Sequence, residues 1–117
     1  MDANTMNKMV ETADTMRRWV TAAGNLEEAV AACEKVALVL ETTMGLWQAA
    51  RYAYKGREIA FHASIWLTDM RLAACAERST KKAVALREAA RRVQDRLEQI
   101  RVDFRRAEKE QLESSTR

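Results

Sequence analysis

Apolar residues recur along this chain at alternating intervals of three and four positions, and polar or charged residues fill most of the gaps. The pattern is clearest between Ala83 and Leu112. Its apolar positions are Leu86, Ala90, Val93, Leu97, Ile100, Phe104 and Ala107. A mean interval of 3.5 residues places them along one side of a helix that packs lengthwise against another helix. The pattern therefore predicts a long, coiled-coil-like helix over about residues 80–112.

The same rhythm predicts two earlier helices, over about residues 3–23 and 26–54. In the first, the apolar positions are Met6, Met9, Ala13, Met16, Val20 and Ala23, and in the second they are Leu26, Val30, Cys33, Ala37, Leu40, Met44 and Trp47. Between them, Gly24 can adopt the left-handed conformation that ends a helix, and Asn25 with Glu28 forms a capping-box pattern. So short a junction predicts antiparallel neighbours. The pair Lys55-Gly56 is the expected end of the second helix.

Residues 45–67 allow two interpretations. Ile59, Phe61, Ala63, Ile65 and Leu67 alternate as in a β-strand, and with the Lys55-Gly56 turn they could form a hairpin. Helical spacing from Ile59 to Ala73, together with several alanines, favours a third helix over about residues 57–78. Ser79-Thr80 offers an N-cap for the last helix, but no glycine marks a break. Whether the third and fourth helices are separate or form one bent rod therefore stays open, and residues 113–117 are expected to fray.

Composition agrees with an all-α fold in one domain spanning residues 1–117. The chain has no proline, which would break a helix interior, and its length suffices for a core without disulfides or metals. We predict a three- or four-helix antiparallel bundle with a long C-terminal helix. Two distant cysteines suit a reducing compartment, and neither a signal peptide nor a membrane span is visible. The sequence thus suggests a cytoplasmic protein.

Motifs for catalysis, metals or cofactors are not visible in the sequence. His62 is the only histidine, so neither a histidine pair nor a Glu-x-x-His di-iron set can form. Cys33 and Cys75 lack CxxC spacing and are expected to be buried, reduced and unpaired. The three glycines are isolated, which argues against a phosphate-binding loop. We therefore expect no catalytic residue, no metal, no cofactor and no enzyme activity.

The segment from Arg78 to Arg106 is basic, with ten basic against four acidic residues. Clustered arginines can neutralise nucleic-acid phosphates. The candidate contacts are Arg78, Lys81, Lys82, Arg87, Arg91, Arg92 and Arg96. The competing interpretation is a solvated helix face in which neighbouring side chains pair. The expected pairs are Glu88 with Arg91 or Arg92, Glu98 with Arg101, Arg105 with Glu108, and Arg106 with Glu110.

Most of the aromatic residues lie between positions 47 and 66. They are Trp47, Tyr52, Tyr54, Phe61 and Trp66. Aromatic side chains are frequent both in cores and in the centres of protein interfaces. We weigh these two roles equally, and the set is a candidate partner interface.

The flanks of the last predicted helix favour self-assembly in an antiparallel arrangement. A parallel pair would set Arg96 against Arg101 and Asp103 against Glu108, both unfavourable. At about 45 Å this helix is longer than the first, at about 30 Å, so one end needs another chain to cover it. The expected oligomer interface is Leu97, Ile100, Phe104 and Ala107. The sequence therefore favours a non-enzymatic interaction protein, a scaffold, adaptor or structural subunit that forms homo-oligomers. Binding of another protein partner is a further interpretation, and nucleic-acid binding is the alternative function.

Overall fold

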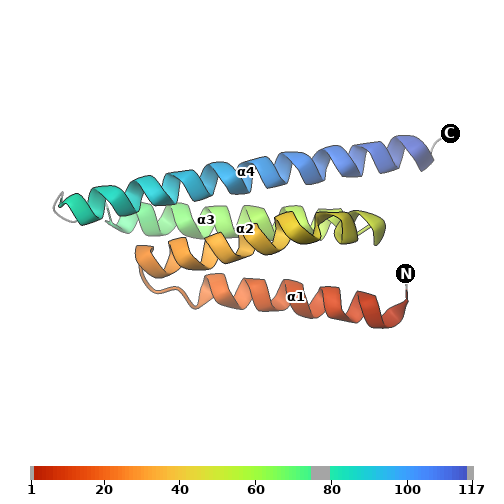
Figure 1. Cartoon of the computed structure of the whole chain (residues 1–117), viewed down its shortest axis with the longest axis horizontal. Helices are drawn as coiled ribbons and strands as arrows, with labels where there is room; N and C mark the ends of the chain where they lie inside the picture. The colour runs from red at the N-terminus through yellow and green to blue at the C-terminus, as the bar shows by residue number, and fades with distance from the viewer. Residues whose placement is uncertain (1, 75–79, 116–117) are drawn as a thin grey trace.

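The chain folds into a bundle of antiparallel helices in the computed structural model (Figure 1), which describes residues 2–74 and 80–115. Its elements are α1 (Ala3–Thr21), α2 (Leu26–Ala49), α3 (Ala53–Ala74) and α4 (Lys81–Ser115), and the described residues contain no strand. The all-α prediction is confirmed. The β-hairpin alternative for residues 45–67 is wrong, because α2 and α3 occupy nearly all of that segment.

The four helices are not arranged as a closed square. α2 and α3 pack against each other, α1 covers one side of this pair and α4 covers the other (Figure 1). Over the described residues, α1 and α4 make no contact with each other. Cα positions extend over 56 × 28 × 18 Å, so the molecule is long and flat. α3 therefore contacts α1, α2 and α4, yet one of its sides is covered by none of them.

α3 and α4 are two antiparallel helices and not one bent rod. Arg57 near the start of α3 contacts Glu108 near the end of α4, whereas Arg71 near the end of α3 contacts Gln94. α4 begins after Thr80, whose hydroxyl accepts a hydrogen bond from the Ala83 amide at 3.1 Å. The other predicted cap, Ser79, and predicted helix residues 75–78 lie outside the described residues. α4 runs on through Ser115, so residues 113–115, which were expected to fray, are helical.

The junction of α1 and α2 follows the predicted capping pattern with one change. The Asn25 side chain accepts a hydrogen bond from the Glu28 amide at 2.9 Å, as expected. The Glu28 carboxylate accepts from the amide of Gly24, at 2.8 Å, and not from that of Asn25. α1 ends at Thr21, and Gly24 does not adopt the predicted left-handed conformation. The α1 end needs no left-handed residue, because the Ala22 amide donates to the Arg18 carbonyl at 3.0 Å.

The predicted end of α2 at Lys55-Gly56 is wrong. α2 stops at Ala49, and the left-handed residue after it is Arg51, with φ of 57°. The Tyr52 amide donates to the Trp47 carbonyl at 2.8 Å, which is the closing hydrogen bond of a Schellman motif. The Tyr52 ring also stacks on Trp47, with ring centroids 5.6 Å apart. This apolar contact accompanies the motif and holds the tight turn into α3.

Gly56 lies inside α3, where it permits close packing against α4. A Cβ atom at Gly56 would lie 2.6 Å from the Phe104 ring, far inside van der Waals contact. The glycine that resembled a helix end in the sequence therefore provides the space for the largest buried side chain of α4.

The core is continuous through the bundle and includes the apolar seam of α4. The expected interface residues Leu97, Ile100, Phe104 and Ala107 are all buried within the single chain. The expectation that these four need a second chain to cover them is therefore wrong. Helix length does not decide the coverage here, because α4 packs on both α2 and α3, whose combined surface covers the seam as far as Ala107.

Candidate interaction surface

The aromatic residues singled out in the sequence separate into two groups. Trp47 is buried, and its indole N–H donates to the Thr43 hydroxyl at 2.8 Å. Trp66 is partly buried and donates to the Ala23 carbonyl at 3.3 Å, and Tyr52 stacks on Trp47. These three residues therefore belong to the packing of the bundle. Tyr54 meets the Tyr52 ring edge-on, with ring centroids 5.3 Å apart, but 52% of its surface is exposed, and Phe61 is 46% exposed.

Tyr54 and Phe61 belong to a row of large apolar side chains on the outer side of α3. The row continues with Ile65, which is 45% exposed, and Leu72, which is 67% exposed. At 3.6 residues per turn, the four positions lie within about 20° of one line along the helix. We call Tyr54, Phe61, Ile65 and Leu72 the α3 stripe. The opposite side of α3, which includes Ile59, Ala63 and Leu67, is buried in the core.

Ile65 and Leu72 were not predicted to belong to a surface, although the sequence carries a signal for them. The alternation of apolar residues from Ile59 to Leu67 resembled a strand. In a helix the same alternation arises when both sides are apolar: Ile59, Ala63 and Leu67 face inward, and Phe61 and Ile65 face outward. The strand-like pattern thus marked a helix with two apolar sides.

Arg101 of α4 borders the stripe. Its guanidinium lies over the Phe61 ring, 4.6 Å from the centroid, and donates to the Glu98 carboxylate at 2.6 Å. The Arg101 Nε atom is buried and has no hydrogen-bond partner in the described part of the chain. A cation–π contact of this kind at an exposed site is worth about 0.5–1 kcal/mol. A shallow hollow of about 250 Å³ opens here, lined by Tyr54, Arg57, Glu58, Phe61 and Arg101.

Ion pairs connect the rim of the stripe to the neighbouring helices. Arg57 of α3 contacts Glu108 of α4 at 2.9 Å, and Arg17 of α1 contacts Glu58 of α3 at 2.8 Å. All four side chains are partly exposed, so each pair contributes at most about 1 kcal/mol to stability. Their clearer effect is geometric, because they fix the α1 and α4 surfaces on either side of the stripe. These two pairs therefore join the N-terminal half of α3 to α1 on one side and to α4 on the other.

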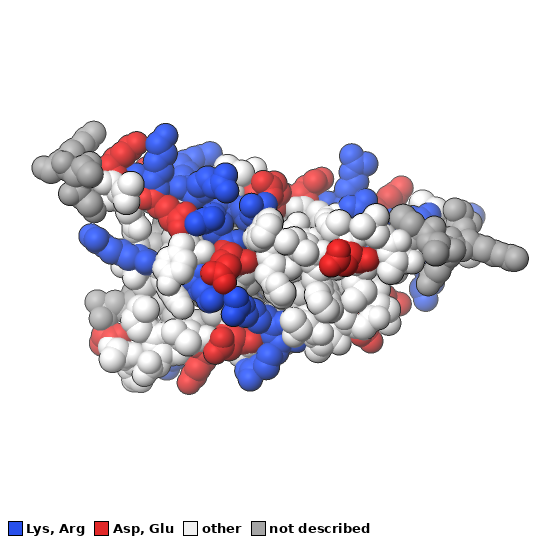
Figure 2. Space-filling view, turned by 180° about the vertical axis from the view of Figure 1, so that it is seen from behind, with Lys and Arg blue, Asp and Glu red and all other residues white. Residues whose placement is uncertain are grey.

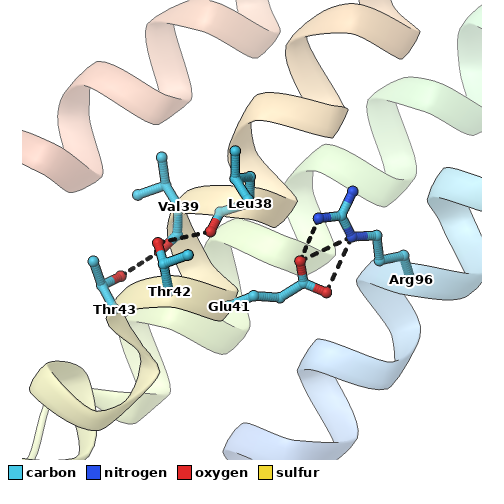
Figure 3. Close-up of polar contacts among 6 residues, drawn as sticks. All are labelled: Leu38, Val39, Glu41, Thr42, Thr43 and Arg96. Carbon is cyan, nitrogen blue, oxygen red and sulfur yellow. Dashed lines mark hydrogen bonds and ion pairs between the residues drawn. The ribbon is translucent and has the colours of Figure 1, made fainter.

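The basic candidates for nucleic-acid contact are only partly available. Arg96 forms a bidentate pair with Glu41 of α2 (Figure 3), and this hydrogen bond raises the pKa of Arg96. Lys82 lies 4.0 Å from Glu27, and Arg78 is outside the described residues. The other candidates have no ion pair within residues 2–74 and 80–115. They are Lys81, Arg87, Arg91 and Arg92.

Most of the predicted charge pairs along α4 do not form. Glu98 pairs with Arg101, as predicted. Glu108 pairs with Arg57 of α3 in place of Arg105, because the neighbouring helix lies within reach. No contact with Arg91, Arg92 or Arg106 is found for the predicted acidic partners in the described part of the chain. On the face shown in Figure 2, lysine and arginine side chains lie over the upper left and in a band that crosses the middle to the lower edge, with acidic side chains among them. A mostly uncharged area lies to the right of centre.

Cys33 and His62 show no arrangement typical of catalysis. Burial raises the pKa of the Cys33 thiol to about 12, and Sγ lies 3.6 Å from the Ala63 carbonyl oxygen. A thiol in this state is not a nucleophile at neutral pH. Cys33 is free and buried, as predicted, whereas Cys75 lies outside the described residues. His62 is half-buried beside Trp66, with ring centroids 6.4 Å apart.

Comparison with known proteins finds no match for this chain among protein families, curated proteins or solved structures. Among the described residues, no three His, Cys, Asp or Glu side chains gather as metal ligands would. None of the helices in the described segments is long and apolar enough to cross a membrane. The α3 stripe and the basic residues of α4 are therefore the surface features that bear on function.

Proposed function

We propose that this chain is a non-enzymatic helical interaction protein, a scaffold, adaptor or structural subunit, that binds protein through the α3 stripe. The observation that carries the proposal is the exposure of Tyr54, Phe61, Ile65 and Leu72 along one line of a helix whose other side is already buried. A helix that is apolar on both sides is normally covered on both sides. Apolar stripes on rigid helices are also the usual docking surface for a partner helix.

The magnitude of apolar burial shows what kind of contact the stripe can support. Complete burial of a large apolar side chain is worth roughly 1.5–3 kcal/mol. Because about half of each stripe residue is exposed, covering all four yields about 4 kcal/mol before the cost of association is subtracted. Even with that cost left out, this energy corresponds to a dissociation constant of only about 1 mM. A functional complex therefore also uses the polar rim formed by residues of α1 and α4.

Site-specific photo-crosslinking in the native host tests this proposal. A benzophenone amino acid at Phe61 should crosslink to protein, because the stripe is covered in the cell. The same amino acid at Leu38 is the control, since Leu38 is also apolar and 55% exposed but lies on α2, away from the stripe. Equal crosslinking at both positions, or none at Phe61, would contradict the proposal.

Nucleic-acid binding is the second candidate, and it is supported by the absence of an ion pair to Arg87, Arg91 or Arg92 within the described residues. If these side chains bind phosphates, affinity for a DNA or RNA strand should fall steeply as salt is raised. Replacing all three with Gln should weaken binding without unfolding the helix. The matched control is Gln at Arg105, Arg106 and Lys109, which removes equal charge from the other end of α4. No binding at low salt would exclude this candidate.

A further inference from the structure

The spacing of the α3 stripe is symmetric along the helix. Tyr54 and Leu72 lie equally far from Ala63, and so do Phe61 and Ile65, which gives successive intervals of seven, four and seven residues. We propose, on the basis of the function proposed above, that the stripe binds the stripe of a second copy of this chain. The two α3 helices then lie antiparallel, and a two-fold axis passes level with Ala63.

This arrangement pairs every apolar residue of the stripe. Phe61 of each copy packs against Ile65 of the other, and Tyr54 packs against Leu72 of the other. The two-fold axis repeats each pair, so the contact contains four apolar layers. The stripe is about 27 Å long at 1.5 Å per residue, so the layers extend over most of α3. In a two-fold contact between identical helices, this symmetric spacing places an apolar residue opposite every apolar residue, whereas an unrelated partner would gain nothing from the symmetry.

The charges beside the stripe are complementary in the same arrangement. When two helices meet face to face and antiparallel, the α4 side of one copy lies against the α4 side of the other. Arg101 lies level with Phe61, which faces Ile65 of the second copy. Because α4 runs antiparallel to α3, Glu98 lies one turn along, toward the level of Ile65. Arg101 of each copy therefore comes close to Glu98 of the other, and the axis produces this pair twice.

Arg101 is suited to bind a second carboxylate from the other copy. Within one chain its guanidinium donates to Glu98 at 2.6 Å, while its Nε–H has no acceptor in the described residues. An arginine can bind two carboxylates, because it has five donors in a planar fork. A second carboxylate, brought by the other copy, provides the missing acceptor after a small rotation of the side chain. The self-contact thus adds the polar rim that the four apolar residues alone lack.

Mixing two charge-reversal variants tests this inference directly. Wild-type protein at tens of micromolar should sediment as a dimer of the 13.3 kDa chain. Glu98→Arg places four cations around the two-fold axis and Arg101→Glu places four carboxylates there, so each variant alone should be monomeric. Their equimolar mixture should form heterodimers, because every contact then joins opposite charges. If the charges interact only within one chain, mixing changes nothing, and that result would overturn the inference, as would a monomeric wild type.

Spin-label distances test the orientation of the two copies. In a Cys33→Ala, Cys75→Ala background, a label at Tyr54→Cys should lie about 27 Å along the axis from its counterpart, and one at Phe61→Cys only about 6 Å. A parallel pair would give a short separation at both positions and would contradict the antiparallel contact. Circular dichroism on each labelled variant confirms that the helices remain folded.

The outcomes separate this inference from the proposed function. A monomeric wild type whose Phe61 position still crosslinks to another protein in cells would refute the second copy and leave the interaction role intact. A monomeric wild type with no crosslinking at Phe61 would refute both.

Discussion

The two sides of α3 are both apolar, yet they are built differently. The inner side uses small residues at its closest contacts, including Gly56, Ala60 and Ala63, and each of them is buried. The outer side uses the large residues Tyr54, Phe61, Ile65 and Leu72, and each of them is about half or more exposed. Small residues let neighbouring helices approach closely, while large exposed ones provide apolar area that the single chain does not use. Stability and association should therefore depend on opposite sides of one helix.

Removal of the side chain that fills the inner side should give the largest effect. Phe104 is fully buried against Gly56, so Phe104→Ala should lower the free energy of unfolding by about 3–5 kcal/mol through lost burial and a residual cavity. Chemical denaturation measures the change. Val102→Ala is the control on the same helix, and because Val102 is exposed its effect should stay within about 0.5 kcal/mol. Equal effects of the two substitutions would show that α4 does not pack as described.

The same substitution at two helical glycines should have opposite signs. Gly56→Ala should destabilise the fold by about 1–3 kcal/mol, because the new methyl group overlaps the Phe104 ring. Gly45→Ala should stabilise it by about 0.5–1 kcal/mol, since nothing lies within 4 Å of the added carbon and alanine is the better helix former. Thermal or denaturant unfolding of both variants provides the comparison. A stabilising Gly56→Ala would mean that α3 and α4 are not in close contact there.

Thiol labelling should show a smaller effect, which concerns how well the packing on the inner side of α3 shields Cys33 from solvent. Cys33 lies against the Ala63 carbonyl, and burial raises its pKa to about 12, so it is neutral and inaccessible at pH 8. In a Cys75→Ala background, a thiol reagent should react with Cys33 only when the protein unfolds. A Leu38→Cys variant that also carries Cys33→Ala and Cys75→Ala provides an exposed thiol that should react at once. Rapid labelling of native Cys33 would show that the inner side opens easily.

Periodicity along the chain correctly predicted the helices, and residue types correctly predicted the N-caps at Asn25 and Thr80. The predicted helix ends at Gly24 and at Lys55-Gly56 were wrong, and neither signal could identify what covers each apolar side. The α4 seam was recognised residue by residue, and all of the residues from Ala90 to Ala107 in it are buried. A 3.5-residue period indicates that one side of a helix is covered by another helix, whereas which helix covers it depends on the fold. The seam therefore resembled an interface between chains until α2 and α3 were seen to cover it.

Two local features were beyond the sequence for a different reason. Gly56 carries the same signal whether it ends a helix or permits a close contact, and only the position of Phe104 distinguishes the two. Arg51 adopts a left-handed conformation that is usually taken by glycine, so the turn after α2 could not be predicted from residue type. The α3 stripe could have been predicted, because strand-like alternation within a helical pattern indicates a helix with two apolar sides.

Sedimentation velocity of Ile65→Glu tests most directly whether the outer side of α3 serves association and not folding. The carboxylate would oppose Phe61 of the second copy, so the variant should be monomeric at concentrations where the wild type is a dimer. Its free energy of unfolding, measured at a concentration where both proteins are monomeric, should match that of the wild type within about 0.5 kcal/mol. Leu38→Glu, an equal change on α2, should leave the dimer intact. An Ile65→Glu variant that still sediments as the wild type does would contradict the account.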